Sequence, residues 1–187
     1  AVNQGIARAD GRIILVLNPD CELIEDSAAV LVRLLDERPE VGIVGAKLLN
    51  SDRSHQPSVR RDPDVLSQAL LMLKLHLVYD APLKHYLYDD LPEDYCGEVP
   101  QIMGSCFAFR RALVEEIGGL DERFFIWFEE VDFMKRAREQ GWKIWYQPTT
   151  AVIHHGGRSF GQLGTPKRQR YFTASLIKYM EKHQGWL

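Results

Sequence analysis

Residues 124–155 have the sequence FFIWFEEVDFMKRAREQGWKIWYQPTTAVIHH, and our expectations for the fold and the chemistry both start from this stretch. It holds three carboxylates, Glu129, Glu130 and Asp132, among large aromatic residues. Such neighbours exclude water, and clustered like charges disfavour full ionisation, so the pKa of at least one carboxyl group is raised. A carboxylate tuned in this way can act as a general base near neutral pH. The aromatic residues are Phe124, Phe125, Trp127, Phe128 and Phe133.

The carboxylates lie at the start of a predicted helix. Apolar residues recur at helical spacing over 131–137, charged residues occupy the other face, and Gly141 follows as a stop signal. The backbone dipole of a helix favours negative charge in its first turn, which supports a simpler alternative. In that alternative the two glutamates only cap the helix, and Asp132 pairs with Arg136 four residues later. Helix-start statistics alone favour the cap, whereas the aromatic frame and the rest of the chain favour a catalytic site.

Length and composition predict one domain with its own core. The chain has 187 residues, of which 45% are hydrophobic and 26% charged, as in ordinary soluble globular proteins. A formal net charge of -3 gives no electrostatic reason to expect nucleic-acid binding. The basic cluster Lys167, Arg168 and Arg170 is local, and we interpret it as a solvated helix face.

Cysteine usage and hydropathy predict a cytoplasmic protein. Cys21, Cys96 and Cys106 are odd in number and lack CxxC spacing, which indicates reduced thiols. No signal peptide opens the sequence. The longest apolar run, 70–78, contains two polar residues and is too short to span a bilayer.

The first half of the chain contains a β-α-β pattern. Residues 13–17, IILVL, form a continuous apolar run that is typical of a strand buried on both faces. The strand ends at the turn 18–20, because Pro19 cannot donate to a sheet. A helix is expected between residues 26 and 39, followed by a second strand over 41–46, VGIVGA. This order predicts a parallel strand pair joined by a right-handed crossover.

Asp20 lies at the carboxyl end of the first predicted strand, which we expect to be central and parallel. Open α/β sheets bind their ligands at that edge. On these residues alone a plain turn is the simpler account, since Asn18, Pro19 and Asp20 are all turn-forming residues.

Residues 50–97 are predicted to form an insertion of loops and one helix within the domain. In 50–64, Arg60 and Arg61 suit contact with a phosphate, although a solvated loop is the simpler account. Residues 65–78 place leucines on one side of a helix, and core packing is the simpler explanation for them. The alternative is a helix that lies on a membrane or a partner, which the scarcity of nearby basic residues disfavours.

The second half of the chain adds further candidate residues. Gly104 and Ser105 lie in the middle of a predicted strand over 99–111, where a missing side chain lets a ligand approach closely. His154 and His155 are adjacent on a predicted strand over 151–154, so they face opposite ways and only one can serve a site. A histidine followed by two glycines, downstream of a carboxylate helix, is a candidate contact for a metal or phosphate. We expect strands over 99–111, 143–146 and 151–154 and helices over 112–117 and 166–183.

Five motifs in fixed order resemble inverting family 2 glycosyltransferases of the GT-A fold, of the rhamnosyltransferase-like kind. The resemblance spans nearly the whole chain. The motifs are NQGIA at 3–7, LVLNPD at 15–20, VGIVGAKL at 41–48, GSCFAFRRALVEEIGGLDERFFIWFEEVDF at 104–133, and GWKIWYQPTTAVIHHGG at 141–157.

The resemblance implies an α/β fold in which helices flank a mixed, Rossmann-like sheet, and it assigns roles to residues. The family's first acidic motif, which binds a divalent metal (Mg²⁺ or Mn²⁺) and the sugar-nucleotide diphosphate, matches Asp20. One of its two usual acids is Asn18 here, which weakens the expected metal binding. The family's catalytic base matches Glu129-Glu130, with Glu130 replacing the usual Asp. Its late histidine matches His154, with His155 as the fallback.

The implied activity is the transfer of a sugar from a dTDP- or UDP-sugar to a hydroxyl of a glycan or lipid-linked acceptor, in the synthesis of cell-surface polysaccharide. Glu130 would take the acceptor proton, with Glu129 and Asp132 beside it, and the oxygen would attack opposite the leaving diphosphate, inverting the configuration. The protein would be cytoplasmic or peripheral at the cytoplasmic membrane. We assign donor and acceptor binding to Asn18, Gly104, Ser105, Trp127 and Arg158.

The resemblance also predicts that this chain is the later part of a GT-A domain. Residues 1–12 have the pattern of a helix tail, and by the resemblance we expect this chain to lack the family's nucleotide-base-binding segment. An open apolar edge beside 13–17 would favour a homodimer or aggregation, and poor sugar transfer by the chain alone. Two alternatives stay open: a non-catalytic binding or interaction module, and a metal-dependent hydrolase built on Asp20, the acidic triplet and His154.

Overall fold

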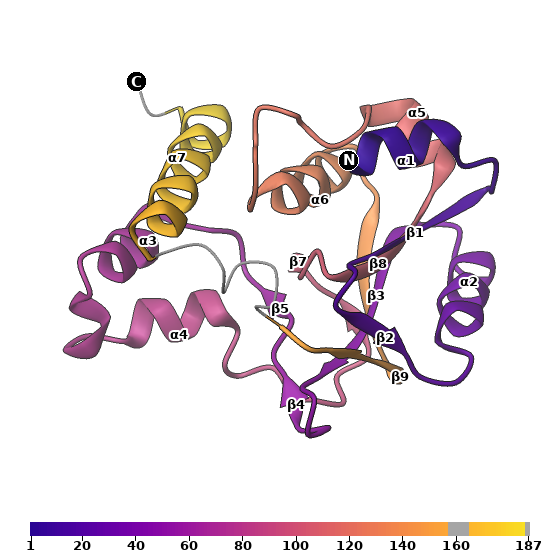
Figure 1. The fold of residues 1–187 in the computed structure, drawn as a ribbon, viewed down its shortest axis with the longest axis horizontal. Coiled ribbons are helices and arrows are strands. Elements are labelled where there is room, and N and C mark those ends of the chain that lie inside the picture. Colours follow the sequence, from indigo (N-terminus) through magenta and orange to yellow (C-terminus); the bar gives the residue numbers. More distant parts are fainter. Residues whose placement is uncertain (157–164, 186–187) are drawn as a thin grey trace.

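The computed structural model describes residues 1–156 and 165–185 and has a mixed sheet between layers of helices (Figure 1). Within those residues the main sheet has seven strands, with the order β1-β8-β3-β9-β2; β4 pairs with β3, and β6 with β9. This is the α/β class predicted from the sequence. The strands of the main sheet are β1 (Ile13–Leu17), β2 (Cys21–Leu23), β3 (Val41–Leu49), β4 (His55–Gln56), β6 (Gly97–Glu98), β8 (Cys106–Arg110) and β9 (Lys143–His154).

Two other short strands form a separate small sheet, and the helices cover both faces of the main one. The small sheet pairs β5 (Val59–Arg60) with β7 (Gln101–Ile102). The helices are α1 (Val2–Arg8), α2 (Ser27–Glu37), α3 (Val65–Met72), the 3-10 helix η1 (Leu75–Leu77), α4 (Ala81–Leu87), α5 (Arg111–Ile117), α6 (Glu129–Glu139) and α7 (Thr165–Gln184). None of the helices in the described ranges is long and apolar enough to cross a membrane.

The predicted neighbours β1 and β3 do not pair. Strand β8 lies between them and is antiparallel to both, with Ile13 opposite Arg110 on one side and Ile43 opposite Phe109 on the other. The parallel partner of β3 is β9. The expectation of a directly paired β-α-β unit was therefore wrong, because a strand from a distant part of the chain occupies the gap.

The sequence had suggested that the strand at 13–17 is central, but β1 lies at the edge of the sheet. Only Ile14 is fully buried in it, and Leu17 is exposed. A continuous apolar run predicts burial on both faces, but an edge position leaves one side of the strand uncovered. The predicted open edge beside 13–17 is thus present within the described chain.

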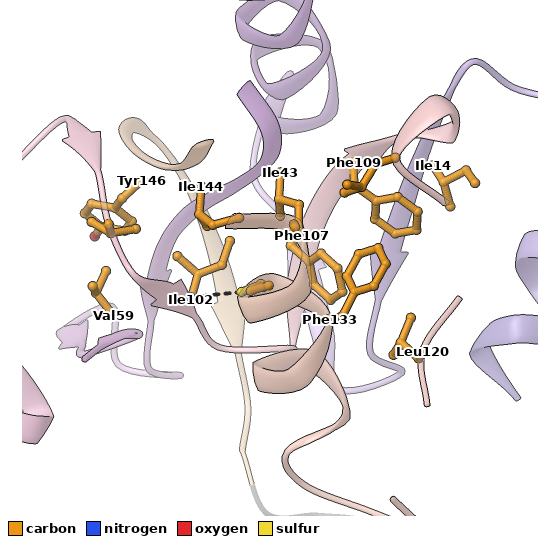
Figure 2. Packing of buried hydrophobic residues seen from close by; sticks show 14 of the residues in the cluster. Ile14, Ile43, Val59, Ile102, Phe107, Phe109, Leu120, Phe133, Ile144 and Tyr146 are labelled. Carbon is orange, nitrogen blue, oxygen red and sulfur yellow. Dashed lines mark hydrogen bonds between the residues drawn. The ribbon is translucent and has the colours of Figure 1, made fainter. Parts of the chain in front are cut away.

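Alternating side chains of the sheet build two cores. One face, with Ile43, Phe107, Phe109 and Ile144, packs against α6 together with α1 and α5 (Figure 2). The other face packs against the leucines of α2. In the first core the rings of Phe109 and Phe133 meet edge to face with centroids 5.3 Å apart. This packing fixes the position of α6, and with it the carboxylates at its start.

Several predicted boundaries differ from the structure. Gly104 and Ser105 are not in the middle of a strand, since they form a turn between β7 and β8. Strand β9 is continuous where two strands were expected, with a register shift that skips from Gln147 to Ala151. The break is a bulge rather than a strand end.

Several leucines of residues 65–78 are exposed and do not pack into the core. Leu66, Leu73 and Leu77 are 56%, 68% and 78% exposed, so core packing is wrong for these three. The helix ends at Met72 and is followed by a short 3-10 turn. Figure 1 shows α3 and α4 on the left, at the end of the molecule away from α2. The apolar face of this insertion therefore points to solvent.

Replacing Phe133 with Ala is expected to lower the free energy of unfolding by about 3–5 kcal/mol, because a fully buried ring leaves a cavity between α6 and the sheet. The matched control is Phe125→Ala, whose side chain is 75% exposed and whose removal should change stability by less than about 0.5 kcal/mol. Urea denaturation of both variants measures the difference. Equal losses would contradict the described packing of α6.

Candidate functional site

A cavity of about 480 Å³ lies where the ends of β1, β9, the turn before β8 and the start of α6 converge. The fold brings together eight of the ten residues that the sequence assigned to the site. Asp132 lies elsewhere, and Arg158 falls outside the described residues. The lining residues are Asn18, Pro19, Asp20, Met103, Gly104, Ser105, Ile126, Trp127, Glu129, Glu130, His154 and Arg168.

Backbone hydrogen bonds fix the turn that carries Asp20. The N–H of Asn18 donates to the carbonyl of Ser105 at 2.9 Å, and the N–H of His155 donates to the carbonyl of Asp20 at 2.9 Å. Strand β2, which follows the turn, pairs with β9 so that Cys21 is opposite His154. The turn is therefore held between two strands, and the Asp20 carboxylate lies 3.6 Å from His154 Nε2.

The Asp20–His154 pair has the donor atoms and the supporting contacts of a metal site. His154 Nδ1 is 2.7 Å from Gln56 Oε1, and the amide of Gln56 donates from Nε2 to Asn50 at 2.8 Å. Because Gln56 presents its oxygen, Nδ1 carries the proton and Nε2 is left with a free lone pair towards Asp20. A carboxylate oxygen and an imidazole nitrogen suit a divalent ion such as Mn²⁺.

Two neighbours of this pair contribute less to such a site. The sulfur of Cys21 lies within 4.8 Å of the Asp20 and His154 ligand atoms. Burial, and then the charge of Asp20, raises the pKa of the Cys21 thiol to about 11, so the thiol stays protonated and donates to the Ser105 carbonyl at 3.4 Å. His155 points away from the cavity, to Ser51 at 2.8 Å and Glu22 at 3.5 Å. As predicted, the adjacent histidines face different sides.

Glu130 has the electrostatics of a general base. Burial raises its pKa to about 7, the charge of Glu129 adds to the rise, and backbone N–H groups of Glu130, Gly104 and Val131 partly offset it. Burial also raises the pKa of Glu129. A Cβ atom on Gly104 would lie 3.0 Å from Glu130 Cγ, so the glycine makes room for this side chain.

Two buried polar atoms at the cavity have no hydrogen-bond partner in the described part of the chain. They are the hydroxyl of Ser105 and one carboxylate oxygen, Oε2, of Glu129. Buried polar atoms in native proteins are nearly always hydrogen-bonded, and an unpaired one costs roughly 1–3 kcal/mol. Because both residues line the cavity, a bound ligand could satisfy both atoms.

Asp132 does not line the cavity, and the structure supports the simpler sequence interpretation for it. The residue is fully buried and pairs with Arg136 at 2.8 Å, Lys182 at 2.6 Å and His183 at 2.7 Å. Burial by itself would raise the pKa of Asp132, but hydrogen bonds from these three residues outweigh it and lower the pKa. Arg136 also donates to the carbonyls of Ile117 and Gly119. Asp132 thus ties α6 to α7 and to the end of α5.

The aromatic residues that were predicted to surround the carboxylates do not all lie beside them. Trp127 and Phe128 adopt left-handed backbone conformations, with φ values of 56° and 71°, just before α6. Their rings pack on Phe172 of α7, and strained residues of this kind cluster at functional sites. Phe133 belongs to the main core and Phe125 is exposed, so these two do not shield the carboxylates.

The sequence analysis missed two contributors. Gln56 orients His154 from almost a hundred residues away, and nothing in its local sequence marks it. Arg168 was interpreted as part of a solvated helix face, and it is exposed, but it also lines the cavity. Only the position of α7 beside α6 brings this positive charge to the site (Figure 1).

Comparisons with known proteins show the fold and the family of this chain. The structure resembles the crystal structure of GalNAc-T7 with UDP, GalNAc and Mn²⁺, with a TM-score of 0.53 at 16% identity over 81% of this chain and 29% of that one. This likeness shows the GT-A fold. The model of the glycosyltransferase like family 2 matches residues 1–173, and the chain belongs to that family.

Two similar proteins are named as rhamnosyltransferases, and both are longer than this chain. Over 173 residues the chain is 27% identical to the N-acetylglucosaminyl-diphospho-decaprenol L-rhamnosyltransferase of Mycobacterium tuberculosis, covering 92% of this chain and 56% of the relative. Over 185 residues it is 26% identical to the rhamnosyltransferase WbbL of Escherichia coli, covering 97% of this chain and 66% of that protein. The chain thus spans little more than half of the Mycobacterium relative.

The variant Asp132→Asn is expected to lose about 3–5 kcal/mol of stability, because it leaves buried cations without their counter-ion. Glu139→Gln on the same helix is the control; it breaks an exposed pair with Lys135, 3.6 Å apart, and should cost less than about 1 kcal/mol.

Denaturation as a function of pH gives a second check on Asp132. Since its folded pKa is lowered, its contribution is complete above the unfolded pKa of about 4 and disappears as the pH falls through the folded value. The wild type should therefore lose stability below about pH 4 more steeply than Asp132→Asn. Parallel acid profiles for the two proteins would contradict the ion-pair network.

Proposed function

We propose that this chain carries the acceptor-activating and metal-binding part of an inverting glycosyltransferase. The enzyme moves a sugar from a nucleotide-diphosphate donor, a dTDP- or UDP-sugar, to an acceptor hydroxyl in the synthesis of cell-surface polysaccharide. The observation that carries the proposal is that Glu130, with a pKa near 7, and the Asp20–His154 pair line one cavity. The activity of the whole protein is part of the proposal, since the chain covers 56% of the relative from Mycobacterium tuberculosis.

In the proposed reaction, Glu130 takes the proton of the acceptor hydroxyl as its oxygen attacks the anomeric carbon. The attack comes from the face opposite the leaving diphosphate, so the configuration inverts. Burial keeps the pKa of Glu130 high, and the charge of Glu129 adds to the effect. A divalent cation, when bound, would neutralise charge on the departing diphosphate.

Asp20 and His154 would hold this cation, and Gln56 keeps the imidazole in the required tautomer. The neighbour GalNAc-T7 was crystallised with Mn²⁺ and UDP, which supports Mn²⁺ or Mg²⁺ for this site. Arg168 adds positive charge at the cavity wall, and Asn18, Gly104, Ser105 and Trp127 line the space for donor and acceptor. Arg158 stays a prediction for donor binding.

The acceptor is proposed to be a glycan or a lipid-linked sugar. The relative from Mycobacterium tuberculosis is named for a diphospho-decaprenol-linked sugar, which supports this class. We also propose that the protein is cytoplasmic. The exposed leucines of α3 and η1 support peripheral contact with the membrane, and the open edge at β1 supports a homodimer. We further propose that residues 1–187 form one domain with 50–97 inserted into it.

The variant Glu130→Gln, made in the complete enzyme, should lower turnover by about 10²–10⁴-fold, because a general base contributes on that scale. Turnover of the wild type should rise with pH and level off above about 7, since the base must be deprotonated. Glu139→Gln, on the exposed face of the same helix, is the control and should leave the profile unchanged. Near-wild-type turnover of Glu130→Gln would remove Glu130 from this role.

Calorimetry with Mn²⁺ and UDP or dTDP tests the metal site. Asp20→Asn should abolish the Mn²⁺-dependent binding of the nucleotide, and Gln56→Ala should weaken it by about 10–100-fold through loss of His154 orientation. His155→Gln is the control, because His155 points away from the cavity.

The same titration separates the three functional classes. Binding that requires the diphosphate supports a transferase, metal binding without nucleotide dependence supports a hydrolase, and no binding supports a non-catalytic module. Equal nucleotide binding by the wild type and Asp20→Asn would contradict the proposed metal site.

A further inference from the structure

A second cavity of about 310 Å³ adjoins the catalytic one, since Met103 and His154 line both. Five of its seven lining residues come from the insertion 50–97, and among the described residues its permanent positive charge is the guanidinium of Arg60. Four of the seven are polar: Gln56, Arg60, Asp89 and His154. The lining residues are Gln56, Pro57, Arg60, Leu87, Asp89, Met103 and His154.

Arg60 is a half-buried cation without a counter-ion. Its guanidinium donates to the carbonyl of Val59 at 2.7 Å, and no carboxylate of the described chain lies within 4 Å of it. Burial lowers the pKa of Arg60, and the weaker opposing effects come from Tyr86 and Asp89. Asp89 is exposed at the rim of the cavity. Desolvating a charge is costly unless it is paired, so this arrangement is suited to an anion that arrives from outside.

The next residue, Arg61, differs from Arg60 because its charge is paired. Arg61 forms two hydrogen bonds to Asp90, at 3.1 and 3.2 Å, and its guanidinium lies 3.7 Å from the centre of the Tyr88 ring. Its charge is thus already compensated within the insertion. Of the two adjacent arginines, only Arg60 lines the cavity and lacks a carboxylate partner.

The shared wall brings Arg60 and the proposed base into adjoining cavities. Met103 and His154 line both cavities, with Arg60 in one and Glu130 in the other. A molecule with a hydroxyl at Glu130 could therefore extend past Met103 to Arg60. The two ends of this path differ in charge, one anionic and one cationic.

We propose that Arg60 binds the phosphate that links the acceptor sugar to its carrier, while the sugar hydroxyl lies at Glu130. Guanidinium groups recognise phosphate through paired N–H donors, and Arg60 is the cationic residue of this cavity. The donor diphosphate belongs to the Asp20–His154 end of the catalytic cavity, so the acceptor is the second source of phosphate. This inference rests on the proposed function and specifies its acceptor.

The test measures the binding of N-acetylglucosamine 1-phosphate and of an uncharged octyl glycoside of the same sugar, by calorimetry. Arg60→Gln should weaken binding of the phosphate by about 10–100-fold, the usual range for a hydrogen bond to a charged group, and leave the glycoside unchanged. Arg61→Gln is the matched control and should bind both as the wild type does. Arg60→Lys keeps the charge without the paired donors and should fall between them.

A parallel titration with UDP and Mn²⁺ distinguishes this inference from the proposed function. Arg60→Gln should bind UDP–Mn²⁺ as tightly as the wild type and unfold at the same temperature. The inference is overturned if Arg60→Gln and Arg61→Gln bind the sugar phosphate equally, if the wild type does not bind it, or if Arg60→Gln weakens UDP–Mn²⁺ binding instead. A wild type that fails to bind UDP–Mn²⁺ but binds the sugar phosphate through Arg60 would contradict the proposed function alone.

Discussion

The site depends on the turn between β1 and β2, which backbone hydrogen bonds hold between two other strands. The bond from Asn18 to Ser105 joins the turn to the start of β8, and the bond from His155 to Asp20 joins it to the end of β9. These contacts bring residues that are more than 130 positions apart into one cavity wall. Without them Asp20 would be an ordinary turn residue at the edge of a sheet.

The opposite wall of the cavity is formed at the start of α6, where three carboxylates in one helical turn point in different directions. Successive residues of a helix point about 100° apart, so Asp132 faces away from Glu130. Asp132 pairs with Arg136, Lys182 and His183 and has a lowered pKa, whereas Glu130 forms no ion pair within the described residues and has a pKa raised first by burial. One carboxylate therefore stabilises the fold, and the other is available for proton transfer. The division follows from their surroundings, since Lys182 and His183 of α7 bind Asp132 directly, whereas Glu130 is buried beside Glu129.

Much of the fold could be predicted from the sequence, and the limits have physical reasons. The helix at 129–139 and the strands at 13–17 and 41–46 follow from local periodicity and stop signals, which the chain carries within each element. The position of β8 between β1 and β3 could not be predicted, because strand order depends on pairings between distant segments. The exposure of Leu66, Leu73 and Leu77 was missed for a related reason, since periodicity shows which face is apolar but not what covers it.

For the candidate site, too, residues within sequence motifs could be predicted, whereas residues that only the fold brings to the site could not. The resemblance to family 2 glycosyltransferases identified Asp20, Glu129, Glu130 and His154, which the structure places around one cavity. Gln56 and Arg168 could be recognised only from the structure, because the positions of β4 and α7 bring them to the site.

The most direct test of a base and a metal site in one cavity is carbon-13 NMR of the protein labelled at its glutamate carboxyl carbons. The Glu130 resonance, assigned by its loss in Glu130→Gln, should titrate with a pKa near 7 and broaden when Mn²⁺ and UDP are added, because the paramagnetic ion would bind in the same cavity. Titration near the ordinary value of about 4.3, with no broadening by Mn²⁺, would contradict the account.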